Sequence, residues 1–171
     1  MKRLLSFALA AILAIAASAQ VNAVGIPFGI SKIKAVELLK YKYGDYDDFS
    51  LDCITYFGFR LDGVTYESAH FFFDDNMRFK NALFTRPKQK KGEDVSRDAV
   101  EIAEILSEKY LVVNLVANDA SQEHHSRDVD LLTMFRAAPR ELVDGRPPFM
   151  IDVVGCFTSN GMYVTVNYSI K

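Results

Sequence analysis

The sequence predicts an α+β domain in which two helices pack on an antiparallel β-meander sheet. In two segments, near residues 31–43 and 94–110, apolar residues recur with the three-to-four-residue spacing of an amphipathic helix. Each of these segments is followed by short β-rich runs that are separated by Asp, Asn and Gly, the residue types that favour turns. The chain is therefore expected to form a helix and then a meander, twice in succession.

The chain begins with the pattern of a cleavable signal peptide. Two cations precede an apolar run from Leu4 to Ala17, and Ala17 and Ala19 supply the small side chains that a signal peptidase requires. The run is shorter than the roughly 20 residues that span a bilayer. We therefore expect residues 1–19 to be removed and residues 20–171 to form a single exported domain, either periplasmic or secreted.

The expected mature domain is mildly acidic. The chain contains 20 Lys and Arg and 22 Asp and Glu, so loss of the two leader cations changes its net charge from −2 to −4. Nucleic-acid binding requires a basic face, so nucleic acid is not expected as a partner. No later segment is long and apolar enough to cross a membrane, so no transmembrane segment is expected after cleavage.

The first half, residues 24–86, is expected to contain one helix and three strands. Ser31 is the expected N-cap, because its hydroxyl can accept a hydrogen bond from the first helical turn. Ile33 and its successors at helical spacing form the expected buried face, and Gly44 ends the helix. Strands are expected at residues 53–57, 64–73 and 78–85.

The second half, residues 93–171, begins with the clearer helix, at 94–110. Its apolar stripe consists of Val95, Ala99, Ile102, Ala103, Leu106 and Tyr110. Strands are expected at 111–116, 130–136, 150–157 and 162–170, with a polar loop at 118–127 and an irregular stretch at 137–148. Asn160-Gly161 predicts a tight type I′ turn between the last two strands.

The ends of the two helices resemble each other. Residues 37–43 read ELLKYKY and residues 104–110 read EILSEKY. One interpretation is a duplication of a helix-plus-three-strand unit, with halves 24–86 and 93–171. The other is coincidence, because these residue types are common near helix ends and the strands show no comparable match.

The stretch Gly29-Ile30-Ser31, followed by Val36 and Leu38-Leu39, resembles the opening of small envelope domains of the β-lactamase-inhibitor-like and SmpA/OmlA-like group. In that group a Gly-x-Ser/Thr turn begins a short helix that packs on an antiparallel sheet. The resemblance implies a non-catalytic domain that binds another protein. This chain lacks the lipidation cysteine of the SmpA/OmlA pattern, so outer-membrane anchoring is not expected.

The two cysteines, Cys53 and Cys156, are candidates for a disulfide in an oxidising compartment. Such a bond would close a loop of about 100 residues and stabilise the fold by roughly 4–5 kcal/mol in the chain-entropy model. The alternative is a pair of separate buried thiols, since free cysteine behaves as a small apolar residue.

The sequence contains no recognisable catalytic motif, and no catalytic residue, metal or cofactor is predicted. His124 and His125, with acidic residues nearby, are weak metal candidates. Adjacent residues of a strand point to opposite faces, and the helical i, i+4 pair of a zinc site is missing. A metal-dependent or other hydrolase built on this loop is the alternative function.

The favoured function is a non-enzymatic module that binds another envelope or secreted protein, through its sheet face or the 137–148 loop. Arg140, Arg146 and Phe149 are the candidate binding residues, because arginine and aromatic side chains suit a protein interface. The alternative for this loop is a structural cap on the open end of the sheet. An enzyme requires convergent polar groups in a cleft, whereas a binding module shows an exposed apolar patch.

Overall fold

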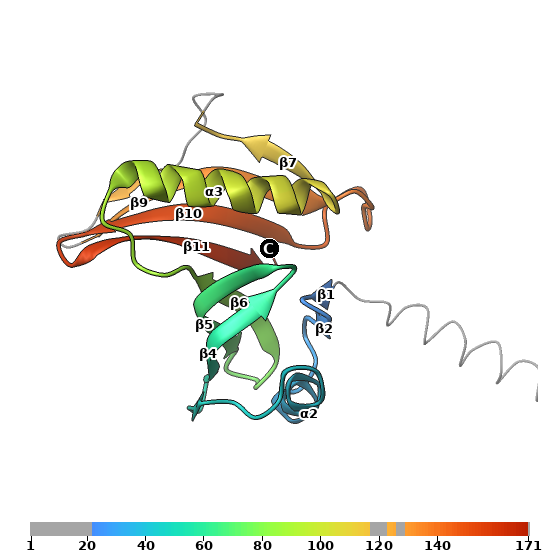
Figure 1. Ribbon diagram of the computed structural model, residues 1–171. Coiled ribbons are helices and arrows are strands. Elements are labelled where there is room, and N and C mark those ends of the chain that lie inside the picture. Colours follow the sequence, from blue (N-terminus) through green and yellow to red (C-terminus); the bar gives the residue numbers. More distant parts are fainter. Residues whose placement is uncertain (1–21, 117–122, 126–128, 171) are drawn as a thin grey trace, which may run out of the picture.

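The computed structural model describes residues 22–116, 123–125 and 129–170, and it has the predicted α+β architecture (Figure 1). The helices are α2 (Lys32–Tyr43) and α3 (Gly92–Ser107). The strands are β1 (Asn22–Ala23), β2 (Ile26–Pro27), β3 (Asp48–Phe49), β4 (Cys53–Leu61), β5 (Val64–Phe73), β6 (Phe79–Thr85), β7 (Tyr110–Asn114), β8 (Glu123–His125), β9 (Val129–Pro139), β10 (Met150–Thr158) and β11 (Gly161–Ser169). Within the described ranges, neither helix is long and apolar enough to cross a membrane.

The two halves of the chain share one continuous antiparallel sheet. Its strand order is β3-β4-β5-β6-β11-β10-β9-β7, with β8 paired to β9 beside β7. Each half therefore contributes a helix and then neighbouring strands, and the final strands of the halves, β6 and β11, pair at the centre. This is the order expected of a duplicated unit, although the duplication itself stays a prediction.

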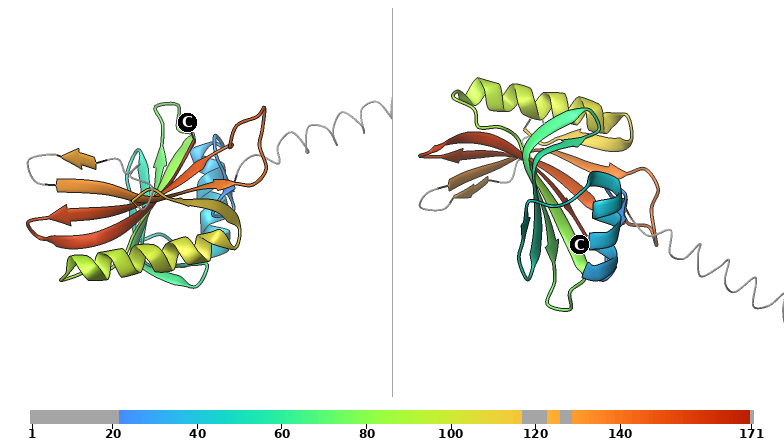
Figure 2. Two further views of the ribbon diagram at one scale, coloured as in Figure 1. Left: turned by 90° about the horizontal axis from the view of Figure 1, so that it is seen from above. Right: turned by 60° about the horizontal axis from the view of Figure 1, so that its bottom comes forward.

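Both helices pack against the same side of the sheet. A row of directly paired residues crosses five strands on this side, and all of its members are buried: Tyr56, Ala69, Phe84, Val166 and Val153. At one end of the row, Tyr43 of α2 contacts Tyr56. At the other end of the row, α3 packs over β7, β9, β10 and β11. Figure 2 shows the two groups of strands crossing in different directions beneath their helices. The opposite side of the sheet is called the helix-free face below.

The buried face of α3 is largely as predicted, and that of α2 is predicted in part, because Leu39 is buried while Val36 and Tyr43 pack against the core. Five residues of the α3 stripe are buried, and its sixth, Tyr110, begins β7. In α2 the buried residues are Lys32, Ala35 and Leu39, while Ile33 is 74% exposed, so its predicted burial is wrong. Ser31 precedes the helix as expected, but its hydroxyl makes no capping hydrogen bond. Its backbone instead forms a β-bridge with Arg78, which fixes the start of the helix.

The type I′ turn forms at a different hairpin from the predicted one. Asp62 and Gly63, between β4 and β5, both have positive φ, at 49° and 86°. Between β10 and β11 only Gly161 has a positive φ, so the predicted type I′ turn at Asn160-Gly161 is wrong. The Thr158 hydroxyl closes this turn by accepting from the Asn160 N–H at 3.2 Å and donating to the Gly161 carbonyl at 2.7 Å.

The predicted disulfide is absent, because both cysteines are free thiols. Cys53 lies in β4 and Cys156 in β10, and three strands separate them. Four strand spacings amount to roughly 19 Å, whereas a disulfide requires Cα atoms within about 7 Å. The Cys53 sulfur instead lies 3.8 Å from the Thr55 hydroxyl, and the Cys156 sulfur lies 3.6 Å from the Thr165 hydroxyl.

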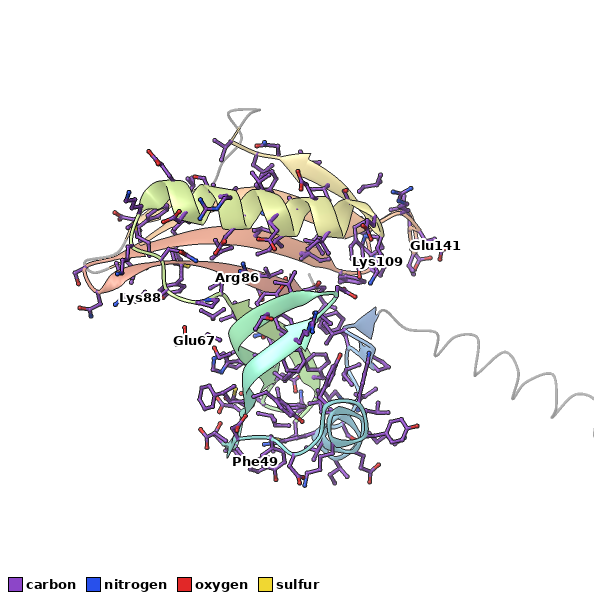
Figure 3. The ribbon with its side chains drawn as sticks, in the orientation of Figure 1. Phe49, Glu67, Arg86, Lys88, Lys109 and Glu141 are labelled. Atoms are coloured by element: carbon purple, nitrogen blue, oxygen red, sulfur yellow. The ribbon has the colours of Figure 1, made fainter. Side chains whose placement is uncertain are left out.

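Arg86 connects the end of the first half to the helix of the second. Its guanidinium donates to the Thr65 carbonyl of β5 at 2.9 Å, and to the carboxylates of Asp98 and Glu101 on α3 at 3.3 and 3.4 Å. Asp98 is buried and also accepts from the Gln89 amide at 2.8 Å. This cluster fixes α3 against the first half of the sheet (Figure 3).

We predict that Arg86→Met lowers the free energy of unfolding by about 3 kcal/mol, because it leaves the buried Asp98 carboxylate without its cation. Arg97→Met is the matched control. It removes an ion pair with Asp94, but Arg97 is 72% exposed, so a loss below about 1 kcal/mol is expected. Urea denaturation of both variants measures the difference, and equal losses would contradict the role assigned to Arg86.

Candidate functional site

A groove of about 580 Å³ lies between α2, the loop that carries β3, and the turn before β6. We call it the α2 groove. It is lined by Ser31, Lys32, Ile33, Val36, Glu37, Tyr46, Phe49, Leu51, Asn76 and Met77. Figure 3 labels Phe49, which lies near the end of α2 at the bottom of the view.

The α2 groove is apolar and open to solvent. Ile33 on one wall and Leu51 on the other are 74% and 77% exposed, and Phe49 is 49% exposed. Single exposed apolar residues are ordinary on protein surfaces, but a contiguous set that lines a hollow is typical of an interaction site. The groove therefore has the exposed apolar surface expected of a binding module.

Lys32 holds the three walls of the groove together. Its backbone N–H donates to the Met77 carbonyl at 2.8 Å, and its ammonium donates to the carbonyls of Ser50 and Leu51 at 2.6 and 2.7 Å. The same ammonium lies 4.0 Å from the centre of the Phe49 ring, within the range of a cation–π contact. One buried side chain of α2 thus positions the loop that forms the opposite wall.

Burial lowers the pKa of Lys32, while the nearby Asp52 carboxylate acts in the opposite direction. The two carbonyls satisfy two of the three ammonium protons, so the cation has partners despite its burial. This arrangement is the reason that a lysine can occupy the buried face of α2.

The far end of the loop is also fixed to α2. The Tyr46 and Phe49 rings stack at 5.3 Å, and the Lys40 ammonium lies 4.9 Å from the Tyr46 ring centre. Lys40 also pairs with the Asp45 carboxylate at 3.1 Å. The groove is therefore a built feature of the fold, because both ends of its outer wall are bonded to the helix.

Sequence reasoning missed this site because it placed Ile33 on the buried face of α2. Periodicity treats Lys32 as polar and Ile33 as apolar, so it exchanges these two neighbouring positions at the start of the helix, while Leu39 is buried as predicted. The sequence signal that could have indicated the groove is the loop between Asp48 and Asp52, in which Phe49 and Leu51 alternate with polar residues.

The residues predicted to bind a partner lie elsewhere and differ in exposure. Phe149 is only 5% exposed and packs between the rings of Phe28 and Tyr110, so it belongs to the core. Arg140 and Arg146 are exposed, and the Arg140 guanidinium donates to the Ser107 carbonyl at the end of α3. The structure does not gather these three residues into one surface.

The 137–148 stretch is more regular than predicted. β9 continues to Pro139, and Val143 and Arg146 exchange two backbone hydrogen bonds across a tight turn. Figure 3 shows Glu141, in this stretch, at the right of the view and Phe49 at the bottom. This turn and the α2 groove are therefore separate surfaces.

The side chains of His124 and His125 lie outside the described residues. Their backbone belongs to β8, which pairs with β9. In the part of the chain whose side chains the structure describes, no group of three His, Cys, Asp or Glu residues could hold a metal ion. The hydrolase alternative, which depends on these two side chains, stays a prediction.

The helix-free face carries a second hollow, of about 410 Å³, that mixes amide, hydroxyl and apolar groups from β6, β9, β10 and β11. Cys156 is in its lining, and burial raises the pKa of this thiol. The thiolate is the nucleophilic form of cysteine, so the raised pKa disfavours nucleophilic chemistry at this position.

On the same face, His70 is held between two hydroxyl groups. Its Nδ1 lies 3.0 Å from the Thr55 hydroxyl, and its Nε2 lies 3.0 Å from the Ser68 hydroxyl. Burial lowers the pKa of His70. Burial therefore favours the neutral ring, which can donate to one hydroxyl and accept from the other.

Comparison of the chain with protein-family models, with curated proteins and with solved structures found no match. The resemblance of the Gly29-Ile30-Ser31 turn to β-lactamase-inhibitor-like and SmpA/OmlA-like domains therefore stays a prediction.

We predict that Lys32→Met lowers the free energy of unfolding by about 1–3 kcal/mol, because the Ser50 and Leu51 carbonyls lose their donor. Lys34→Met, on the exposed face two residues away, is the control and should change stability by about 0.5 kcal/mol or less. Denaturant titration measures both values. Similar effects in the two variants would contradict the positioning role of Lys32.

We also predict a loss of stability between pH 7 and pH 5 that depends on His70. Because the fold lowers the pKa of His70, the unfolded chain binds the proton first, and stability falls as pH drops below about 6.5. Above that pH the contribution is constant. His70→Gln should remove this part of the pH dependence in denaturation measurements.

The chain has three histidines, which provides a matched control for that measurement. A variant with His124→Gln and His125→Gln retains His70 and should retain the pH dependence. If the slope disappears in this variant instead, the assignment to His70 is wrong.

Proposed function

We propose that this chain is an exported, non-enzymatic module that binds another envelope or secreted protein, and that the α2 groove is its contact surface. The observation that carries the proposal is the pair of exposed apolar walls formed by Ile33 and Leu51. Burying such surface is favourable by about 25 cal/mol per Å² of apolar area, and no other described element covers it.

The groove is suited to binding because its walls are held in place before a partner arrives. Lys32 fixes the loop by two hydrogen bonds, and the Tyr46–Phe49 stack fixes it by ring contact. Binding costs less conformational entropy when the contact surface is already rigid in the free protein. A mobile loop with the same residues would bind more weakly.

Export is part of the proposal and is supported by the leader pattern. The Ala17 and Ala19 positions fit the peptidase, and the expected mature N-terminus is Gln20. A partner would then belong to the envelope or to the secreted proteins of the same cell.

A photo-crosslinking amino acid at position 51 tests the proposal in cells that export the chain. Leu51 is expected to crosslink to a protein partner in the envelope or medium, and mass spectrometry identifies both that protein and the Gln20 N-terminus. Position 142 is the control site, because Leu142 is 57% exposed but lies away from the groove. Equal capture at both positions, or none at position 51, would count against the groove.

Binding of the identified partner should then depend on the apolar walls. We predict that Ile33→Asp or Leu51→Asp weakens binding at least about tenfold, because each places a charge in an apolar contact. Leu142→Asp makes the same chemical change outside the groove and should leave affinity unchanged. Calorimetry with the purified partner measures affinity, and thermal denaturation confirms that each variant is folded.

A further inference from the structure

We propose that the α2 groove binds an amphipathic helix of the partner whose apolar face is flanked by Lys or Arg. This inference rests on the proposed function, namely that the groove contacts a protein. It follows from two observations: several backbone groups of the outer wall are already bonded, and the exposed charges around the groove are acidic on balance.

The bonding of the outer wall argues against an added strand. A strand that joined β3 would require free backbone donors and acceptors along that edge. The Phe49 N–H instead donates to the Asp48 carboxylate at 2.8 Å, and Lys32 occupies the carbonyls of Ser50 and Leu51. An extended segment in the groove would therefore bury unpaired backbone groups.

A helix avoids this problem because its backbone groups are bonded to one another. It can bury an apolar stripe against Ile33, Val36 and Leu51 without requiring polar partners from the groove. A binding mode in which an apolar helix face enters a hydrophobic groove is common in protein recognition.

Acidic side chains surround the groove and are open to solvent. Glu37 lies in the lining of the α2 wall, Asp48 and Asp52 adjoin the lining residues of the loop, and Asp75 adjoins the turn. Lysine or arginine side chains at the edges of a bound apolar face would meet these carboxylates.

The lysines of α2 offset this charge only in part, chiefly where Lys32 lies near the Asp52 carboxylate. Lys32 is buried against two carbonyls, Lys40 is paired with Asp45, and the Lys42 ammonium donates to the Val24 carbonyl. Lys34 lies about 160° around the helix from Val36 but only about 60° from Glu37, so it lies beside the outer edge of the α2 wall. Arg78, which follows the lining residue Met77, is an exposed cation whose guanidinium donates to the Gly29 carbonyl at 2.9 Å, and it offsets one of the four carboxylates. The surface that a partner meets is therefore apolar, with a rim that is acidic on balance.

Designed peptides test this inference directly with the processed chain, residues 20–171. Three fluorescent peptides of about 18 residues carry Leu at helical spacing and Lys, Gln or Glu at the remaining polar positions. In low salt we expect the Lys peptide to bind about tenfold more tightly than the Glu peptide, with the Gln peptide between them. In 0.5 M salt the contrast should shrink to about threefold or less, because salt screens exposed charges.

Two further arms locate the effect and test the helical form. Glu37→Gln with Asp75→Asn should weaken Lys-peptide binding about threefold without affecting the Gln peptide. Glu104→Gln with Glu108→Gln removes the same charge from exposed positions in the last turn of α3 and just after it, and should have no effect. A fourth peptide contains the residues of the Lys peptide with Leu at every second position, the spacing of a strand, and should bind more weakly.

The inference is overturned if the Glu peptide binds as well as the Lys peptide, if the alternating peptide binds better, or if no peptide binds. The crosslinking experiment separates this failure from failure of the proposed function. If position 51 captures a partner but the Lys peptide is not preferred, the groove is retained as a contact surface and the basic helix is rejected. Absence of both capture and peptide binding rejects both proposals.

Discussion

Five residue pairs between β6 and β11 join the two halves of the chain into one sheet, and the core depends on their register. In this register Phe84 lies opposite Val166 and Tyr168 opposite Ala82, so all four face the helices. A slip of one residue would turn each side chain to the other face and expose the large aromatic groups. The Phe84–Tyr168 ring contact, at 5.6 Å, extends the aromatic core across the seam and so opposes such a slip.

The α2 groove shows how one polar residue can organise an apolar surface. Without a donor, the loop carbonyls at residues 50 and 51 would have to remain hydrated, and the exposed side chains of Phe49 and Leu51 would lack a fixed position. Lys32 supplies the donor from within the buried face of α2. Arg86 acts in the same way, because its guanidinium donates hydrogen bonds to both β5 and α3. In both cases a cation with several donors links elements that are distant in sequence.

The fold class and most element positions followed from the sequence because periodicity reports the burial of regular elements. The α3 stripe from Val95 to Leu106 is strongly amphipathic, and its predicted burial is confirmed. The start of the α2 face was predicted wrongly, with Ile33 in place of Lys32, because the partners of Lys32 are carbonyls contributed by a loop that sequence alone cannot position. The same limit applies to Cys53 and Cys156, since only strand order reveals the strands between them. The candidate site was missed for this reason: it depends on tertiary contacts of polar atoms.

The seam between β6 and β11 also has a kinetic consequence. Thr85 and Thr165 are directly paired although they are 80 positions apart, so this contact closes a long stretch of chain. Contacts between such distant residues slow folding, because chain entropy is lost before the pairing can compensate for it. Until β11 arrives, β6 presents an unpaired edge beside Phe84, and an edge of this kind can pair with another molecule. Self-association during folding should therefore begin at β6, even though β6 has a neighbouring strand on each side in the finished domain.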